Sequence, residues 1–182
     1  LEHGGDLVGD RVAKDALFDG FADIAKALAN GRRAELIDVL VQGERHVSRF
    51  LQALARSSRP LVAAVQGRAV GVGTTMLLHC DLVYAGDNAA FSMPFVNLGL
   101  CPEAASSLLV PQMLGYHRAA EALLMGEPFM AEAALEVGLA NRVVPPTEVN
   151  AYALAQARKL AAKPLSALIE TKRLMKKGQS AL

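Results

Sequence analysis

Short runs of apolar residues in the middle of the chain predict buried strands. The run at residues 61–65, Leu-Val-Ala-Ala-Val, does not alternate with polar residues, as expected of a strand that is covered on both faces. Glycines surround the segment 67–73, which therefore reads as a turn. The apolar runs predict four strands, at residues 61–65, 81–85, 90–92 and 139–144.

Helical periodicity accounts for most of the remaining chain. In residues 34–56 apolar positions recur at near-helical spacing, and the amphipathic helix should end there because Pro60 disfavours helix at Arg59. Thr147 is the expected N-cap of a later helix. Further helices are predicted at residues 74–80, 105–114, 117–125, 130–137, 148–162 and 165–177. Strands that alternate with helices indicate an α/β domain followed by a helical tail.

The composition excludes several classes of protein. With 182 residues, 52% of them hydrophobic, the chain is long and apolar enough for one domain with its own core. A net charge of +1 argues against nucleic acid or an anionic membrane surface as the main partner. No apolar run approaches the roughly 18–20 residues that span a bilayer. We therefore expect no nucleic-acid partner and no membrane partner.

The cysteines and histidines predict neither a disulfide framework nor a metal site. Cys80 and Cys101 are too few for a framework, and we expect both to be buried free thiols in a reducing compartment. The four histidines show no metal-ligand spacing. The chain starts at Leu1 in a segment that reads as a loop, so we expect an N-terminal portion to be absent from this sequence.

The glycine turn at residues 71–73, Gly-Val-Gly, is a candidate anion site. Glycine lets the backbone approach a ligand, and the N-terminus of a helix presents free N–H groups that can stabilise an oxyanion. A dinucleotide fingerprint would need glycine at Met76, and no P-loop Gly-Lys follows. Taken alone, the turn is more simply explained as a tight connection between two packed elements.

Two further features are chemical candidates only in combination with this turn. The pair Gly4-Gly5 before Asp6 offers another exposed backbone N–H, although alone it predicts a turn. Glu103 follows Pro102 among apolar neighbours and is a candidate acid/base. Its alternative role is that of a first-turn glutamate of the helix at residues 105–114.

The order of these features resembles the crotonase (enoyl-CoA hydratase/isomerase) superfamily. The resemblance covers about residues 1–8 and 57–178, without the family's usual opening strands. It is carried by the Gly-Gly-Asp-Leu of residues 4–7 and by residues 59–67, 69–73, 80–85, 90–91, 97–99, 134–139 and 143–145. It implies an α/β fold with a ClpP-like β-β-α superhelix core over residues 1–145 and a C-terminal helical region, residues 146–182, that serves trimerisation.

The resemblance also implies an acyl-CoA site. Crotonases hold a thioester carbonyl between two backbone N–H groups, which by motif position belong here to Gly5 and Val72. Around these groups, the resemblance implies substrate contacts from Gly4, Asp6, Leu7 and Gly71, with Phe95, Leu98 and Leu100 as walls for the acyl chain.

The catalytic glutamates point to one subgroup. The hydratase subgroup uses two glutamates, and their positions are occupied here by Thr75 and Phe95. Residues 98–107 instead resemble peroxisomal-type Δ3,Δ2-enoyl-CoA isomerases, in which one glutamate, matching Glu103, is the sole acid/base. Ala104 departs from that pattern because glycine is common at its position.

These observations predict an enoyl-CoA isomerase that converts a 3-enoyl-CoA to the trans-2 isomer. It would use no cofactor beyond the coenzyme A of its substrate, and it would assemble as a homotrimer or hexamer. A catalytically degenerate acyl-CoA-binding protein remains an alternative, as does another crotonase reaction (hydratase, dienoyl isomerase or thioesterase). The expected location is cytoplasmic in a bacterium and otherwise peroxisomal or mitochondrial.

Overall fold

The computed structural model describes residues 48–177. The chain divides by its internal contacts into two compact units, Leu1–Arg56 and Ser57–Leu182. In the first unit the described residues, 48–56, are helical, which confirms the end of the predicted amphipathic helix. The rest of that helix and the predicted substrate loop at residues 4–7 lie outside the described residues.

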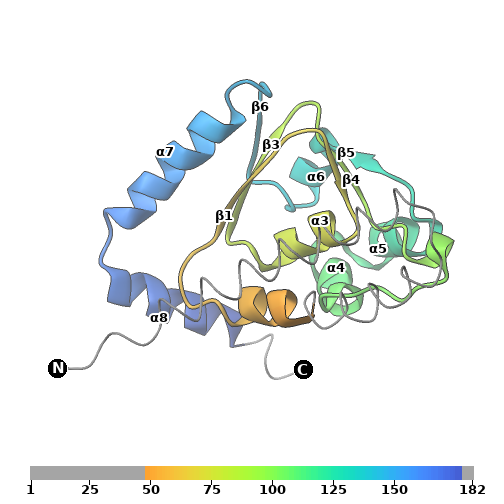
Figure 1. Ribbon diagram of the computed structural model, residues 1–182, viewed down its shortest axis with the longest axis horizontal. Helices are drawn as coiled ribbons and strands as arrows, with labels where there is room; N and C mark the ends of the chain where they lie inside the picture. Colours follow the sequence, from red (N-terminus) through yellow and green to blue (C-terminus); the bar gives the residue numbers. More distant parts are fainter. Residues whose placement is uncertain (1–47, 178–182) are drawn as a thin grey trace, which may run out of the picture. The chain divides into compact units, whose positions relative to one another are not determined.

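The first sheet of the second unit is built from parallel strands in the order β1-β3-β6 (Figure 1). These strands are β1 (Val62–Val65), β3 (Leu82–Gly86) and β6 (Arg142–Val144). All three fall within or beside the predicted strands. In the described chain β1 is an edge strand and only partly buried, so the expectation that it is covered on both faces was wrong.

The second sheet has the order β2-β4-β5, with β4 parallel to β2 and antiparallel to β5. Its strands are β2 (Arg68–Val70), β4 (Ala90–Ser92) and β5 (Phe129–Met130). The sequence predicted β4 but missed the other two. β2 lies inside the segment predicted as a turn, and it is a strand because Arg68 and Val70 pair with Ala90 and Ser92 of β4.

The two sheets arise from coils of chain that stack on one another. A coil runs from β1 into β2 and then into a helix, and the next coil repeats this path through β3 and β4. The register places Val62 beside Leu82 in one sheet and Arg68 beside Ala90 in the other. Each coil therefore contributes one strand to each sheet, as a β-β-α superhelix requires.

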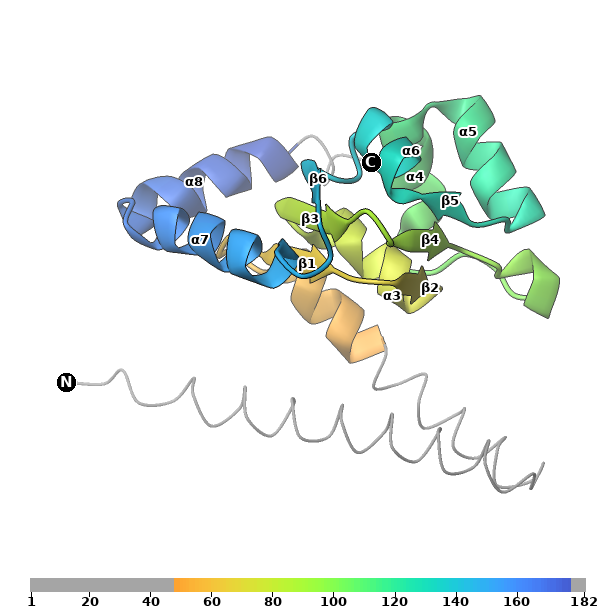
Figure 2. The same ribbon diagram turned by 90° about the horizontal axis from the view of Figure 1, so that it is seen from above.

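The helices flank these strands on two sides. Figure 2 shows α7 and α8 on one side of the strands and α4, α5 and α6 on the other. The helical elements are α3 (Val72–Thr75), the 3₁₀ turns η1 (Met76–His79) and η2 (Val96–Leu98), α4 (Ser106–Leu114), α5 (Tyr116–Ala120), the π-helical turn η3 (Glu121–Met125), α6 (Ala131–Glu136), α7 (Val149–Ala161) and α8 (Leu165–Lys176).

Two predictions of helix detail need correction. The helix predicted at residues 74–80 starts earlier, at Val72, and tightens into the 3₁₀ turn η1 after Thr75. Thr147 is not the N-cap of α7: Glu148 occupies that position, and it makes no side-chain capping hydrogen bond. The helix begins one residue later than the cap prediction requires.

A small-residue core joins both sheets to α6. Phe91 is completely buried, and its ring stacks on Phe129 of β5 with 5.7 Å between centroids. Many of its other members are alanines, which allows the elements to approach closely. The buried members of this cluster are Ala69, Leu77, Val83, Ala85, Ala89, Phe91, Ala131, Ala134, Leu139 and Ala140.

The cysteines differ in exposure. Both are free thiols, as expected. Cys80 is half-buried at the end of η1, where burial, and secondarily the charge of Asp81, raises the pKa of its thiol. Cys101 is exposed in the loop between η2 and α4, so the expectation that both are buried was wrong.

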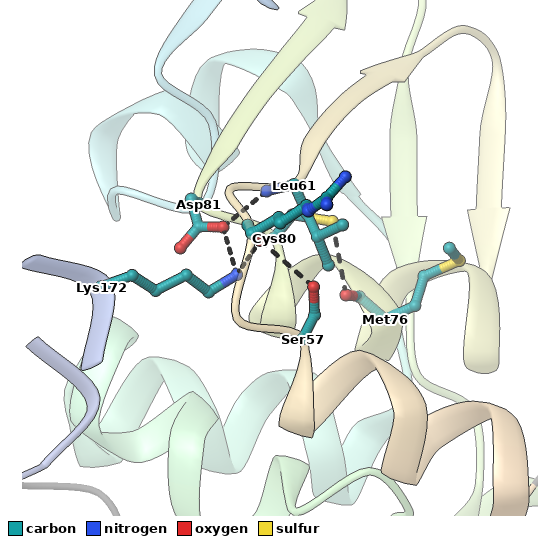
Figure 3. A network of polar contacts seen from close by, with 7 residues as sticks. Ser57, Leu61, Met76, Cys80, Asp81 and Lys172 are labelled. Carbon is teal, nitrogen blue, oxygen red and sulfur yellow. Dashed lines mark hydrogen bonds and ion pairs between the residues drawn. The ribbon is translucent and has the colours of Figure 1, made fainter. Parts of the chain in front are cut away.

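A buried lysine attaches α8 to the first sheet (Figure 3). The Nζ of Lys172 lies 2.7 Å from Asp81 Oδ2 and donates a second hydrogen bond, also 2.7 Å, to the carbonyl oxygen of Arg59. Asp81 in turn accepts a hydrogen bond from the Leu61 N–H at 2.7 Å. Only 4% of the Lys172 side chain is exposed, so the ammonium depends on these partners.

We expect Lys172→Met to destabilise the fold by about 2–4 kcal/mol, because it leaves the largely buried Asp81 carboxylate without its counter-ion. Urea unfolding followed by circular dichroism measures the loss. The double variant Asp81→Asn/Lys172→Met should recover part of it, since no unpaired charge is then buried.

The next residue along α8 gives the matched control. Arg173 pairs with Glu170 on the exposed side of the helix. Arg173→Met should leave the unfolding midpoint unchanged. Equal stability of Lys172→Met and the wild type would contradict a stabilising role for the Lys172–Asp81 pair.

Candidate functional site

The candidate site begins at a sharp turn between β2 and α3. Gly71 has φ 56° and ψ −119°, a conformation that side chains other than glycine tolerate poorly. Its N–H donates to the carbonyl oxygen of Ser92 on β4 at 2.9 Å, and its own carbonyl oxygen accepts from the N–H groups of Thr74 and Thr75. The turn is therefore fixed to the second sheet as it starts the helix.

Val72 is the first residue of α3 and carries one of the two predicted oxyanion donors. N–H groups in the first turn of a helix have no acceptor within that helix. Val72 itself is half-buried. The other predicted donor, Gly5, and its neighbours Gly4, Asp6 and Leu7 lie outside the described residues.

Two adjacent buried threonines on α3 make different contacts. The Thr74 hydroxyl donates to the Ala69 carbonyl oxygen at 2.7 Å and accepts from the Ser92 N–H at 3.3 Å, which ties α3 to β2 and β4. The Thr75 hydroxyl donates to Glu103 Oε1 at 2.8 Å. Thr74 thus anchors the helix, whereas Thr75 contacts the predicted acid/base.

Glu103 contacts α3, the same short helix that begins with Val72. Its half-buried side chain reaches Thr75, which lies one turn after Val72, or roughly 4.5 Å along a helix axis at 1.5 Å per residue. A carboxylate and a first-turn backbone N–H therefore lie on neighbouring turns of chain. This arrangement can place one acid/base beside a polarised oxygen.

The backbone after Glu103 is strained and held in place. Ala104 and Ala105 have φ values of 54° and 55°, in the left-handed region that residues with a side chain seldom adopt. The ring Nε2 of His79 lies 2.9 Å from the Ala104 carbonyl oxygen, so it donates there. The Ser106 N–H, at 2.9 Å, and the Ser106 hydroxyl both donate to the Glu103 carbonyl oxygen.

The sequence analysis did not identify the side chains that contact Glu103 and the loop after it. Thr75 entered the analysis only as a position that lacks a glutamate, and His79 and Ser106 had no assigned role. The signal was present in the spacing: His79 follows Thr75 by one helical turn, so both can face the same loop. Both His79 and Ser106 are buried, at 8% and 0% exposure.

The predicted acyl-chain residues occupy two environments. Phe95 is buried in an apolar cluster with Met93 and Val110, below the loop that leads to Glu103. Leu98 and Leu100 are exposed, at 71% and 57%, on either side of Gly99. Leu98 and Leu100 are thus free to contact a ligand at the surface, while Phe95 supports the loop from inside.

A cavity of about 320 Å³ lies between α5, η3 and α6, but neither Val72 nor Glu103 lines it. Within residues 48–177, no group of three or more His, Cys, Asp or Glu side chains is placed to hold a metal ion. None of the helices described is both long and apolar enough to cross a membrane.

Comparisons with known proteins show the family to which the chain belongs. The model of the enoyl-CoA hydratase/isomerase family matches residues 22–182. Enoyl-CoA delta isomerase 2 of Rattus norvegicus is 37% identical over 71% of this chain and 33% of its own length. The 2,3-dehydroadipyl-CoA hydratase of Escherichia coli (strain K12) is 36% identical over 67% of this chain and 48% of its own length. The chain thus matches less than half the length of either relative.

A solved structure gives the same result at the level of the fold. An enoyl-CoA hydratase/isomerase from Pseudoalteromonas atlantica T6c superposes with a TM-score of 0.71 and is 44% identical. The superposition covers 72% of this chain and 53% of that protein. The predicted α/β class and crotonase fold are confirmed.

We expect Ala104→Gly to stabilise the protein by about 0.5–1 kcal/mol, because glycine adopts φ near 54° without the cost that alanine incurs. Thermal unfolding measures the change. Ala155→Gly, at an exposed position inside α7, is the matched control and should destabilise by about 1 kcal/mol. If both variants lose stability equally, the left-handed conformation of Ala104 is not strained.

Proposed function

Because the chain belongs to the enoyl-CoA hydratase/isomerase family, we propose that it moves the double bond of a 3-enoyl-CoA to the trans-2 position. Two of the three groups that this reaction needs belong to described residues: the Val72 N–H and the Glu103 carboxylate. The third, the N–H of Gly5, follows from the resemblance of residues 4–7 to the family's substrate loop.

In the proposed mechanism, the thioester oxygen accepts hydrogen bonds from the Val72 and Gly5 N–H groups. Glu103 removes a proton from C2, and the electron pair of that C–H bond moves into a dienolate whose negative charge rests on the thioester oxygen. The two N–H groups stabilise this charge. Glu103, now protonated, returns its proton to C4, so the double bond shifts with no net gain or loss of atoms.

The observation that carries this proposal is the hydrogen bond between Thr75 and Glu103. The side chain that contacts the carboxylate is a neutral hydroxyl at the position where the hydratase subgroup has a glutamate. Phe95, at the position of the other hydratase glutamate, is apolar and buried. One carboxylate suffices for a proton that leaves and returns, and this favours isomerisation over the addition of water.

Hydration is the second candidate, because the Escherichia coli relative is named as a hydratase. It would require a water molecule to be activated and a proton to be delivered to the adjacent carbon. Product analysis after incubation with 3-enoyl-CoA and, separately, with 2-enoyl-CoA distinguishes the two reactions. A 3-hydroxyacyl-CoA product would support hydration, and a trans-2-enoyl-CoA product would support isomerisation.

We also propose that the protein assembles with copies of itself. The C-terminal helices α7 and α8 leave large apolar side chains exposed, and an assembled homotrimer or hexamer would cover them. These side chains are Leu154, Leu165, Leu174 and Met175.

We expect Glu103→Gln to lower kcat for 3-enoyl-CoA isomerisation by at least about 100-fold, because a glutamine keeps the shape of the side chain but cannot accept the proton. A spectrophotometric assay of 2-enoyl-CoA formation measures kcat, and calorimetry with a non-isomerisable acyl-CoA measures binding, which should persist.

Glu132→Gln, an exposed glutamate on α6, serves as the control and should retain wild-type activity. Wild-type turnover in Glu103→Gln would refute the role of Glu103. Binding of acyl-CoA without isomerisation by the wild type would favour a catalytically degenerate acyl-CoA-binding protein.

A further inference from the structure

We propose that Thr75 is a positioning residue whose hydroxyl fixes the orientation of the Glu103 carboxylate. This inference rests on the proposed function for its catalytic meaning. The hydrogen bond itself, 2.8 Å from Thr75 Oγ1 to Glu103 Oε1, does not depend on which reaction the site performs.

The environment of Thr75 leaves its hydroxyl few alternatives. The residue is completely buried, so the hydroxyl cannot turn to bulk water. A buried hydroxyl without a partner is unfavourable, and Glu103 Oε1 provides that partner. Among the described residues, Thr75 is the side-chain donor to Glu103, which leaves Oε2 as the oxygen available to take a substrate proton.

A threonine suits a carboxylate that must gain and lose a proton. Its hydroxyl can donate to the ionised carboxylate and can also accept from the protonated acid, so the contact can persist through both states. The hydrogen bond to the charged form is the stronger one. Loss of the hydroxyl should therefore remove the contact that holds the carboxylate in place in both states.

The main chain of Glu103 is held independently of its carboxylate. Ser106 donates to the Glu103 carbonyl oxygen, and His79 on η1 donates to the carbonyl oxygen of Ala104. With the backbone fixed, the Thr75 hydroxyl determines where the end of the side chain lies.

The test compares Thr75→Val, which keeps the shape of the side chain without the hydroxyl, with Thr75→Ser, which keeps the hydroxyl. For Thr75→Val we expect kcat to fall roughly 10-fold and KM to stay within about twofold, because the substrate still binds while the carboxylate is no longer held in place. Thr75→Ser should restore values close to the wild type.

A second measurement follows Glu103 without turnover. In protein labelled with ¹³C at the glutamate side-chain carboxyl carbon, the signal that disappears in Glu103→Gln belongs to Glu103. Its chemical shift should change in Thr75→Val, which removes the hydrogen bond, and stay near the wild-type value in Thr75→Ser. This signal reports the carboxyl group directly, so the measurement does not depend on turnover.

Thr74→Val is the matched control, since Thr74 is the adjacent buried threonine and its hydroxyl bonds only to backbone groups among the described residues. We expect it to lower Tm without moving the Glu103 carboxyl signal. The inference is overturned if the carboxyl signal and the turnover of Thr75→Val match those of the wild type, or if Thr75→Ser is as defective as Thr75→Val.

The proposed isomerase reaction can be refuted independently of the proposed role of Thr75. If the wild type does not isomerise 3-enoyl-CoA while Thr75→Val still shifts the Glu103 carboxyl signal, the proposed reaction is wrong and the positioning of Glu103 by Thr75 is supported.

Discussion

The hydrogen bond from Thr75 to Glu103 joins a short helix and a loop that lie 28 residues apart in the sequence. Its donor stands on α3, which also presents the first-turn N–H of Val72, and its acceptor is the candidate acid/base. α3 therefore determines both the position of an oxyanion donor and the position of a carboxylate. Because α3 has only four residues, its placement depends on the Gly71 turn and on the Thr74 hydroxyl, both of which bond to Ser92 of β4.

The loop beyond Glu103 contains backbone strain that lowers the stability of the fold. Two consecutive alanines in the left-handed conformation cost on the order of 1 kcal/mol each. The hydrogen bonds from His79 to Ala104, and from Ser106 to Glu103, each contribute about 1 kcal/mol and offset much of that cost. A strained segment that is held by buried polar side chains beside a candidate acid/base is typical of a functional site, where geometry matters more than local stability.

Much of the fold could be predicted from local sequence, since the apolar runs of β1, β3 and β4 carry their own signal. β2 and β5 could not, because each is a strand only through pairing with β4. The candidate site likewise contains residues that local sequence could predict and a contact that it could not. Glycine and glutamate motifs predicted Gly71, Val72 and Glu103, whereas the contact between Thr75 and Glu103 is formed only by tertiary packing. A threonine in an apolar helix gives no indication of a partner 28 residues away.

The identity of the group that contacts Glu103 limits the chemistry available to it. Two carboxylates within hydrogen-bond distance cannot both ionise easily, because each charge disfavours the other, and such a pair tends to share a proton. A neutral hydroxyl imposes no such repulsion, so a single carboxylate beside Thr75 can act first as a base and then, with the proton it has taken, as an acid. A reaction that only moves a proton between two carbons of one substrate needs no more than this. The addition of water needs a further group to position and activate the water molecule, and Thr75 and Phe95 stand where the hydratase subgroup supplies such groups.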